Sequence, residues 1–303
     1  MGIARGSARL LLDECSKRPF QGTVLQLGRQ KLFFNLSQLE EWAPLHGIDL
    51  IESVPISKPS VELMDGDVMD DKTFFFKLGF ENVESCDYSD FQEAEYIFDL
   101  NLPVSEDLHD KFDVIVDFGT TEHIFDLPQV LRNLHNMLKV GGRVIHMLPS
   151  SNWVDHGFYM FSPTIFHDYY SANNWAIETA RIIELTRRHN IDPWRIYNYE
   201  PGILNPLSSG GFDKGYLVNI FFVVTKTNKS VCSQIPQQSR YQMGKWNTAS
   251  QNDSSSKFQN NLKQRLSVVI NWMKSIPLFY SIFMSITYFF LRKKRMPPLI
   301  AKY

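Results

Sequence analysis

The stretch from Phe112 to Pro163 constrains the possible folds of this chain more than any other segment. It opens with an apolar run, Phe112–Phe118, which ends at a polar loop and is followed by a helical pattern over 127–138. A second apolar run, Arg143–Leu148, then breaks into a polar and aromatic loop. Strand, loop, helix and strand in this order are typical of a parallel βαβ unit. Ligands of such open sheets bind beyond the carboxyl ends of the strands, so both loops are candidate binding loops.

Apolar runs and helical patterns alternate along the chain up to about residue 227. Seven segments have the composition of strands: 22–28, 82–86, 94–98, 112–118, 143–148, 176–185 and 216–227. Helical or long crossovers join the first five of them. We therefore predict an α/β fold with a doubly wound, mostly parallel, seven-stranded Rossmann-like sheet. The last strand is expected to pair antiparallel, at or near an edge of the sheet.

The composition changes twice after this point, which predicts three regions. Residues 1–227 form the folded domain, 228–261 are rich in Ser, Gln, Asn and Lys and are predicted to be a flexible linker, and 262–303 form an apolar helical tail with a basic cluster. The apolar part of the tail, Ser275–Leu291, leaves three alternatives open. It docks on the domain or on a second copy of the chain in a homodimer, it contacts an anionic membrane face peripherally, or it spans a membrane.

Charge and cysteine content narrow the class of protein. The chain has 303 residues and a formal net charge of −2, so it lacks the basic field of a nucleic-acid-binding protein. Its three cysteines offer neither a metal-binding pattern nor a disulfide framework, and the N-terminus lacks the apolar segment of a secretion signal. We expect a cytoplasmic protein, with attachment to the inner membrane face through the tail as one alternative.

Small or polar residues follow the first three predicted strands, where a cofactor would bind. Gly28 ends the first strand, but residues 28–31 lack the further glycines of the GxGxxG dinucleotide signature, so a simple tight turn is an equally good interpretation. Asp87 follows the second strand, where a carboxylate accepts hydrogen bonds from both ribose hydroxyls or else begins a turn. Asp99 and Asn101 follow the third strand, where they either bind an adenine amino group or form an Asx turn.

Three longer motifs occupy the same strand ends: Phe98-Asp99-Leu100-Asn101-Leu102-Pro103, then Phe112–Asp117 with Gly119–His123, then Leu138-Lys139-Val140-Gly141-Gly142. Together they resemble the class I S-adenosylmethionine-dependent methyltransferases, the third being similar to the LKPGG turn of that family. More narrowly, Leu27–Gln30, His156–Tyr159 and Phe161–Pro163 resemble a bacterial methyltransferase-domain group of largely unassigned substrate. The resemblance covers about residues 20–227 and is most specific from Asp99 to Pro163.

The resemblance implies S-adenosylmethionine as the cofactor and a place for each of its parts. Gly28 would approach the methionine part and Asp87 would hold the ribose. Asp99 and Leu100 would line the adenine. The chain departs from the family pattern in having a single glycine in the first loop, and in a long first crossover with an insertion of about 30–81, which forms either a lid or extra packing.

The resemblance also implies which residues lie beside the reacting sulfonium group. These are Asp117, Gly119 and Thr120, at the end of the fourth predicted strand. A sulfonium is a cation, so a nearby carboxylate or an aromatic face suits it.

Methyl transfer is an in-line displacement in which the enzyme aligns the reactants and, for a hydroxyl acceptor, removes a proton. His156, His123 and Tyr159 are the polar side chains that the two loops offer for this task, and His156 suits the role of a base at neutral pH. The alternative for His123 is capping or packing at the start of a helix. The alternative for the aromatic loop around His156 is simply to cover the end of the sheet.

The remaining histidines give weaker indications of a functional site. Asp155 and His156, combined with His123 or His167, invite a metal-binding interpretation, but they lack the spacing of metal ligands, so no metal site is predicted. His146 lies inside an apolar run and is expected to be a core histidine with satisfied hydrogen bonds.

The function expected from these features is methyl transfer from S-adenosylmethionine to an oxygen or nitrogen atom of a small-molecule, glycan or lipid-linked acceptor. A non-catalytic methyltransferase-like binding module is the first alternative, because the first loop is poor in glycine. A nicotinamide or sugar-nucleotide enzyme on a similar sheet is the second, and the absence of GxGxxG disfavours it.

Overall fold

The computed structural model describes residues 2–54, 68–204, 212, 215–242 and 296–303. The chain divides into two compact units, and the first holds Met1–Glu200, Phe212–Gln237 and Leu299–Tyr303. The second holds Pro201–Gly211 and Gln238–Pro298, and its described part contains the short helix α6 (Ser239–Gln242). All the strands and the other helices of the described residues belong to the first unit.

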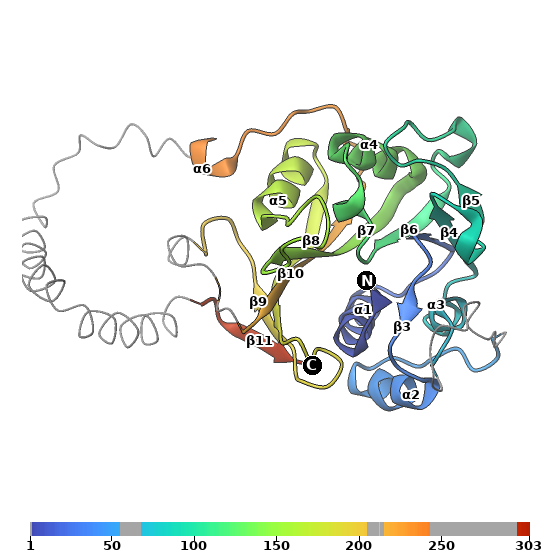
Figure 1. Cartoon of the computed structure of the whole chain (residues 1–303). Helices are drawn as coiled ribbons and strands as arrows, with labels where there is room; N and C mark the ends of the chain where they lie inside the picture. The colour runs from blue at the N-terminus through green and yellow to red at the C-terminus, as the bar shows by residue number, and fades with distance from the viewer. Residues whose placement is uncertain (1, 55–67, 205–211, 213–214, 243–295) are drawn as a thin grey trace, which may run out of the picture. The chain divides into compact units, whose positions relative to one another are not determined.

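The first unit is built on a sheet of nine strands in the order β11-β9-β8-β10-β7-β6-β2-β4-β5 (Figure 1). The strands are β2 (Thr23–Leu27), β4 (Asn82–Asp87), β5 (Tyr96–Ile97), β6 (Phe112–Asp117), β7 (Leu138–Ser151), β8 (Ala176–Leu185), β9 (Arg195–Asn198), β10 (Leu217–Thr225) and β11 (Leu299–Lys302). The five strands from β7 to β5 are parallel, so their carboxyl ends meet at one edge of the sheet. Strand β10 is antiparallel to both of its neighbours, β7 and β8.

All seven predicted strands are present, but the predicted sheet was wrong in two respects. The sheet is mixed rather than mostly parallel, because two unpredicted strands, β9 and β11, add antiparallel pairs beyond β8. Strand β10 is antiparallel as predicted, yet it lies between β7 and β8 and not near an edge. Its register with β7 runs from Val218 opposite Ser151 to Thr225 opposite Arg143, so both of its sides are fully paired.

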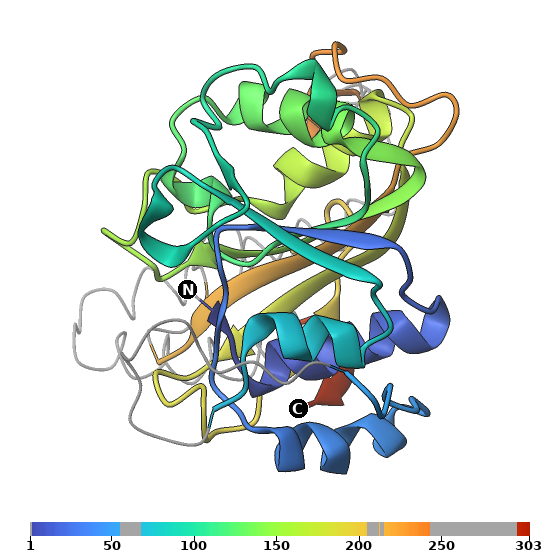
Figure 2. The same cartoon turned by 90° about the vertical axis from the view of Figure 1, so that its right-hand side faces the viewer.

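Helices cover both faces of the sheet (Figure 2). On one face lie α1 (Arg5–Lys17), α2 (Leu36–Leu45) and α3 (Asp71–Lys77), and on the other lie α4 (Leu127–Met137) and α5 (Pro163–Ala172). The period of two along a strand divides the buried residues between these layers. Val114 and Val116 pack toward α1, whereas the intervening Ile115 packs on the opposite side.

The predicted insertion of about 30–81 contributes to the core. Strand β3 (Lys31–Leu32) pairs in parallel with β1 (Gly2–Ile3) at the N-terminus, and α2 begins at a capping box of Asn35 and Gln38. Phe74 and Phe75 of α3 are fully buried. The described part of the insertion therefore provides packing, while residues 55–67 lie outside the described residues.

The prediction of a helical tail was wrong for its last residues. Leu299–Lys302 form strand β11, because the outer side of β9 offers unpaired backbone groups, and Trp194 and Tyr303 exchange backbone hydrogen bonds of 2.7 and 3.1 Å beside it. The apolar segment 275–291 lies outside the described residues. Within the part of the chain that is described, none of the helices has the length and apolar character needed to cross a membrane.

The start of the predicted linker is attached to the domain. The Asn173 side chain donates to the backbone oxygen of Gln234 at 3.0 Å and accepts from its backbone nitrogen at 3.0 Å. The backbone nitrogen of Val231 donates to the oxygen of Asn173 at 2.9 Å. The chain from Thr227 to Gln234 is thus tied to the end of α5.

Candidate active site

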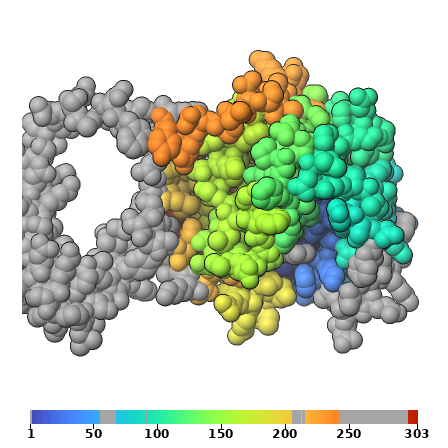
Figure 3. Space-filling view, turned by 45° about the horizontal axis from the view of Figure 1, so that its top comes forward, coloured from blue at the N-terminus to red at the C-terminus, as the bar shows by residue number. Residues whose placement is uncertain are grey.

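A cleft of about 230 Å³ opens at the carboxyl ends of the parallel strands. Figure 3 shows the face of the molecule on which the teal segment of β4 and β5 lies beside the green segment of α4. Six of the seven residues predicted at the cofactor line this cleft together: Gly28, Asp87, Asp99, Leu100, Gly119 and Thr120. His123, predicted for catalysis, lines it as well.

Gly28 forms the floor of the cleft in a conformation that favours glycine. Its φ is +71°, and a Cβ there would stand 3.2 Å from the hydroxyl of Thr120. That hydroxyl donates to the backbone oxygen of Leu27 at 2.5 Å, and the backbone nitrogen of Gly28 donates to the backbone oxygen of Cys86 at 2.7 Å. The ends of β2, β4 and β6 are therefore locked together at Gly28.

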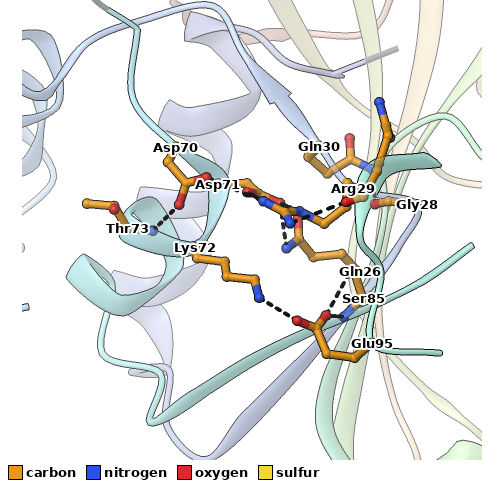
Figure 4. A network of polar contacts seen from close by, with 11 residues as sticks. Gln26, Gly28, Arg29, Gln30, Asp70, Asp71, Lys72, Thr73, Ser85 and Glu95 are labelled. Atoms are coloured by element: carbon orange, nitrogen blue, oxygen red, sulfur yellow. Dashed lines mark hydrogen bonds and ion pairs between the residues drawn. The ribbon is translucent and has the colours of Figure 1, made fainter. Parts of the chain in front are cut away.

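The loop after Gly28 lacks the further glycines of the family pattern, and hydrogen bonds of polar side chains hold it in position (Figure 4). Arg29 forms a two-pronged ion pair with Asp71 of α3, from Nε to Oδ2 at 2.8 Å and from Nη2 to Oδ1 at 2.6 Å. Burial alone would raise the pKa of Asp71, but the hydrogen bonds and charge of Arg29 outweigh it and lower that pKa below its usual range. Gln30 donates to the backbone oxygens of Leu27 and Gly28 at 3.1 and 3.0 Å.

Asp87 and Asp99 each use one carboxylate oxygen in a local turn. Oδ1 of Asp87 accepts from the backbone nitrogen of Tyr88 at 2.7 Å, while Oδ2 lies 3.8 Å from the position of a Cβ on Gly28. Oδ1 of Asp99 accepts from the backbone and the side chain of Asn101, both at 2.8 Å. The turn and the ligand-binding interpretations are therefore compatible, because each carboxylate has a second oxygen.

Asp117 does not line the cleft and instead supports it from below. It is fully buried; Oδ1 accepts from the backbone nitrogens of Thr120 and Thr121, both at 3.2 Å, and Oδ2 accepts from the Thr121 hydroxyl at 2.6 Å. Nδ1 of His146 lies 2.8 Å from Oδ2, and Nε2 of His146 lies 2.7 Å from the hydroxyl of Tyr170. The prediction of a satisfied core histidine at 146 is confirmed.

Two loops bring both predicted histidines to the buried carboxylate of Glu122. Oε1 of Glu122 lies 3.5 Å from Nε2 of His156 and 3.8 Å from Nε2 of His123. The two imidazole rings lie 5.2 Å apart between centroids. A Glu-His pair at the end of a strand was the available signal for this cluster, but its partner His156 is distant in sequence.

The protonation of this cluster follows from burial. Glu122 is fully buried, and burial, with a smaller contribution from the charge of Asp117, raises its pKa to about 8. Burial also lowers the pKa of His123 and of His156 below the ordinary value of a histidine, which favours the neutral imidazole. Neutral imidazoles can accept a proton or bind a metal ion.

The remaining candidates lie apart from this cluster or have other tasks. The Tyr159 hydroxyl donates to the backbone oxygen of Phe125 at 2.7 Å, and the Tyr159 backbone nitrogen donates to the backbone oxygen of Glu122 at 3.2 Å. Tyr159 therefore fixes the loop after β7 against the loop after β6. Asp155 is exposed and His167 lies 3.3 Å from Asp168, so neither joins His123 and His156.

An apolar cavity of about 200 Å³ lies on the other side of the loop after β6. Phe118 lines this cavity, whereas the next residue, Gly119, lines the cofactor cleft. Trp153 also lines it, donates to the side chain of Asn219 at 2.7 Å, and lies 5.0 Å from the ring of His156. The other lining residues are Gly2, Ala4, Ser7, Phe33, Met147, Leu185, His189, Trp194 and Asn219.

Comparison with known proteins identifies the family. The profile of a methyltransferase domain matches residues 31–196, more than half of the chain. The chain belongs to the methyltransferase-domain family. The methyltransferase therefore uses S-adenosylmethionine as its cofactor, and the resemblance of its motifs to class I enzymes is confirmed. No curated protein matches its sequence.

Solved structures similar to the methyltransferase are distant in sequence. The YcgJ protein from Bacillus subtilis is 11% identical with a TM-score of 0.40, and the match covers 74% of this chain and 100% of that one. Geranyl diphosphate methyltransferase in complex with S-adenosylmethionine is 12% identical with a TM-score of 0.39, covering 73% and 85%. The 1,6-didemethyltoxoflavin-N1-methyltransferase of Burkholderia thailandensis is 12% identical with a TM-score of 0.28, covering 73% and 77%.

Proposed function

We propose that the methyltransferase transfers a methyl group to an oxygen or nitrogen atom of a small-molecule, glycan or lipid-linked acceptor. The observation that carries this proposal is the cleft in which Gly28, Asp87, Asp99 and Gly119 come together from the ends of neighbouring strands. The separate apolar cavity beside it offers a place for the second substrate. A two-substrate reaction needs two such adjoining sites.

In this proposal the cofactor lies along the cleft from Gly28 to Leu100. Oδ2 of Asp87 accepts hydrogen bonds from the ribose hydroxyls, and Asp99 with Leu100 borders the adenine. Gly28 and Gly119 leave room for the methionine part, since neither has a side chain. Asp117 has no direct contact in this arrangement and acts by holding Thr120 and Thr121.

The acceptor occupies the apolar cavity, with its reactive atom toward Gly119 and His156. Its lining by Phe33, Phe118, Trp153 and Trp194 suits an acceptor with an apolar or aromatic body. The acceptor lone pair forms the new bond to the methyl carbon, and the electron pair of the breaking bond stays on sulfur. The acceptor proton leaves to His156 or His123, because burial lowers the pKa of both imidazoles and so favours the neutral form that accepts a proton.

Replacing Asp87 by alanine is expected to weaken the binding of S-adenosylhomocysteine roughly a hundredfold or more. Each hydrogen bond to a carboxylate contributes about 1.5–3 kcal/mol, and the variant removes two of them. Isothermal titration calorimetry of the full-length protein measures the change. The matched control is Asp90→Ala, an exposed acid three residues further on, which should bind like the unaltered protein.

Parallel titrations separate the proposal from its alternatives. Binding of S-adenosylmethionine and S-adenosylhomocysteine, without binding of NAD, is the expected pattern. Binding of NAD instead would favour a nicotinamide enzyme. Binding of S-adenosylmethionine without methylation of any acceptor pool supplied with it would favour a non-catalytic module.

A further inference from the structure

We propose that Glu122, His123 and His156 bind a divalent transition-metal ion at the boundary between the cofactor cleft and the apolar cavity. One ligand atom from each of these residues lies within 4.8 Å of the other two. Two imidazole nitrogens and one carboxylate are a donor set typical of zinc and of other divalent transition metals.

The separations within the cluster fit ligands of one ion better than they fit hydrogen bonds. Oε1 of Glu122 is 3.5 Å from Nε2 of His156 and 3.8 Å from Nε2 of His123. An N–H···O hydrogen bond spans about 2.7–3.2 Å. Ligand atoms about 2.0–2.2 Å from a tetrahedral zinc ion stand about 3.3–3.6 Å from each other. A small closing movement of the two rings would complete this geometry.

Buried polar atoms in the cluster have no hydrogen-bond partner. Among the described residues, three atoms of the cluster are buried without a hydrogen-bond partner: Oε1 and Oε2 of Glu122 and Nε2 of His156. Buried polar side chains of native proteins are nearly always satisfied, so Oε1 of Glu122 and Nε2 of His156, unpaired and 3.5 Å apart, need an explanation. A cation bound by both atoms would satisfy them.

The surrounding structure holds the three ligands in place. The backbone nitrogen of Tyr159 donates to the oxygen of Glu122 at 3.2 Å. A Cβ on Gly157 would lie 2.9 Å from the Glu122 backbone oxygen and 3.1 Å from Nδ1 of His123, so only glycine lets the loop of His156 pack this closely. Asp117 anchors the turn that carries Glu122 through Thr121.

The position of the cluster indicates what the ion would do. His123 lines the cofactor cleft, and His156 lies 5.0 Å from Trp153, which lines the apolar cavity. The three protein ligands leave a fourth coordination position open on a tetrahedral ion. This role rests on the proposed function: the ion would hold an oxygen or nitrogen of the acceptor beside the methyl group and so select acceptors that carry such a donor. With Nε2 of both histidines bound to it, the ion would replace them as the group that assists loss of the acceptor proton, by lowering the pKa of the bound acceptor atom.

Metal titration of the full-length protein tests the site directly. Tag-free protein treated with a chelator is titrated with Zn²⁺ by calorimetry and with Co²⁺ by visible absorption, which reports the coordination geometry. We expect one equivalent of either metal to bind. Glu122→Gln and His156→Ala should each weaken binding at least tenfold. The control is His167→Ala, because the His167 side chain is 28% exposed, as is that of His156, and it should leave binding unchanged.

The results distinguish this site from the proposed function. Absence of stoichiometric binding, or equal affinity in the two cluster variants and the unaltered protein, would overturn the metal site. Titration with S-adenosylhomocysteine is made on the same samples, and Glu122→Gln should retain that binding because it leaves the residues of the cofactor cleft intact. Metal binding without S-adenosylhomocysteine binding would support the metal site while removing the proposed function. Circular dichroism shows whether each variant is folded.

Discussion

Replacing Arg29 by alanine is expected to lower the free energy of unfolding by about 3–5 kcal/mol, because it leaves a buried carboxylate without its counter-ion. The side chains of Arg29 and Asp71 are only 9% and 2% exposed, and their two contacts are 2.8 and 2.6 Å long. After the substitution, the side chain of Gln26, 2.9 Å from Asp71, remains as a partner. Urea unfolding followed by circular dichroism measures the loss.

A neighbouring ion pair provides the control. Lys72 and Glu95 pair nearby (Figure 4), but their side chains are 30% and 29% exposed. Lys72→Ala should therefore cost less than about 1 kcal/mol. A loss of that small size for Arg29→Ala as well would show that the buried pair does not hold the loop.

The Arg29 effect should depend on pH in a defined direction. The folded-state pKa of Asp71 lies below its unfolded value of about 3.9, so the pair's stabilisation is complete above that pH. It is lost as the pH falls through the folded-state pKa. The difference in stability between the unaltered protein and Arg29→Ala should thus shrink in strongly acidic solution.

Replacing Asp117 by alanine is the second change with a large expected effect, about 3–5 kcal/mol. It removes the acceptor for two backbone nitrogens, the Thr121 hydroxyl and His146, all of which stay buried or half-buried. Because the freed turn carries Gly119 and Thr120, the affinity for S-adenosylhomocysteine should fall as well. Chemical denaturation and calorimetry measure the two consequences.

Asp113 on the same strand offers a matched comparison for Asp117. Its side chain is 31% exposed and accepts from the backbone nitrogen of Thr23 at 2.8 Å and from Lys139 at 2.8 Å. Asp113→Ala should therefore cost less than Asp117→Ala and should leave cofactor affinity unchanged, since Asp113 lies at the opposite end of β6. Equal losses of stability and affinity in the two variants would contradict the supporting role of Asp117.

Most of the fold was predictable because it rests on local patterns. The strands that run through the core are long and apolar, so their composition alone located them. Helix α1 was not predicted, although its sequence has the apolar periodicity of a helix: Ala8, Leu11, Leu12 and Cys15 have helical spacing and are all buried. Strands β9 and β11 were not predictable in this way, because each has four residues and is stabilised by pairing with a distant segment.

The candidate site shows the same division between local and distant information. Gly28, Asp87 and Asp99 were found because the ends of neighbouring parallel strands must meet. Asp117 was placed wrongly because alternation along β6 turns its side chain to the same face as Ile115, beneath the cleft. The approach of His156 to Glu122 depends on how a distant loop packs, which no local pattern reports.

In the proposed function, the cleft from Gly28 to Leu100 holds S-adenosylmethionine. A crystal structure of the full-length protein with S-adenosylhomocysteine tests it most directly. In that complex the ribose hydroxyls should lie within hydrogen-bonding distance of Oδ2 of Asp87, the adenine beside Asp99 and Leu100, and the sulfur near Gly119. Density for the ligand elsewhere, or an empty cleft at saturating ligand concentration, would contradict it.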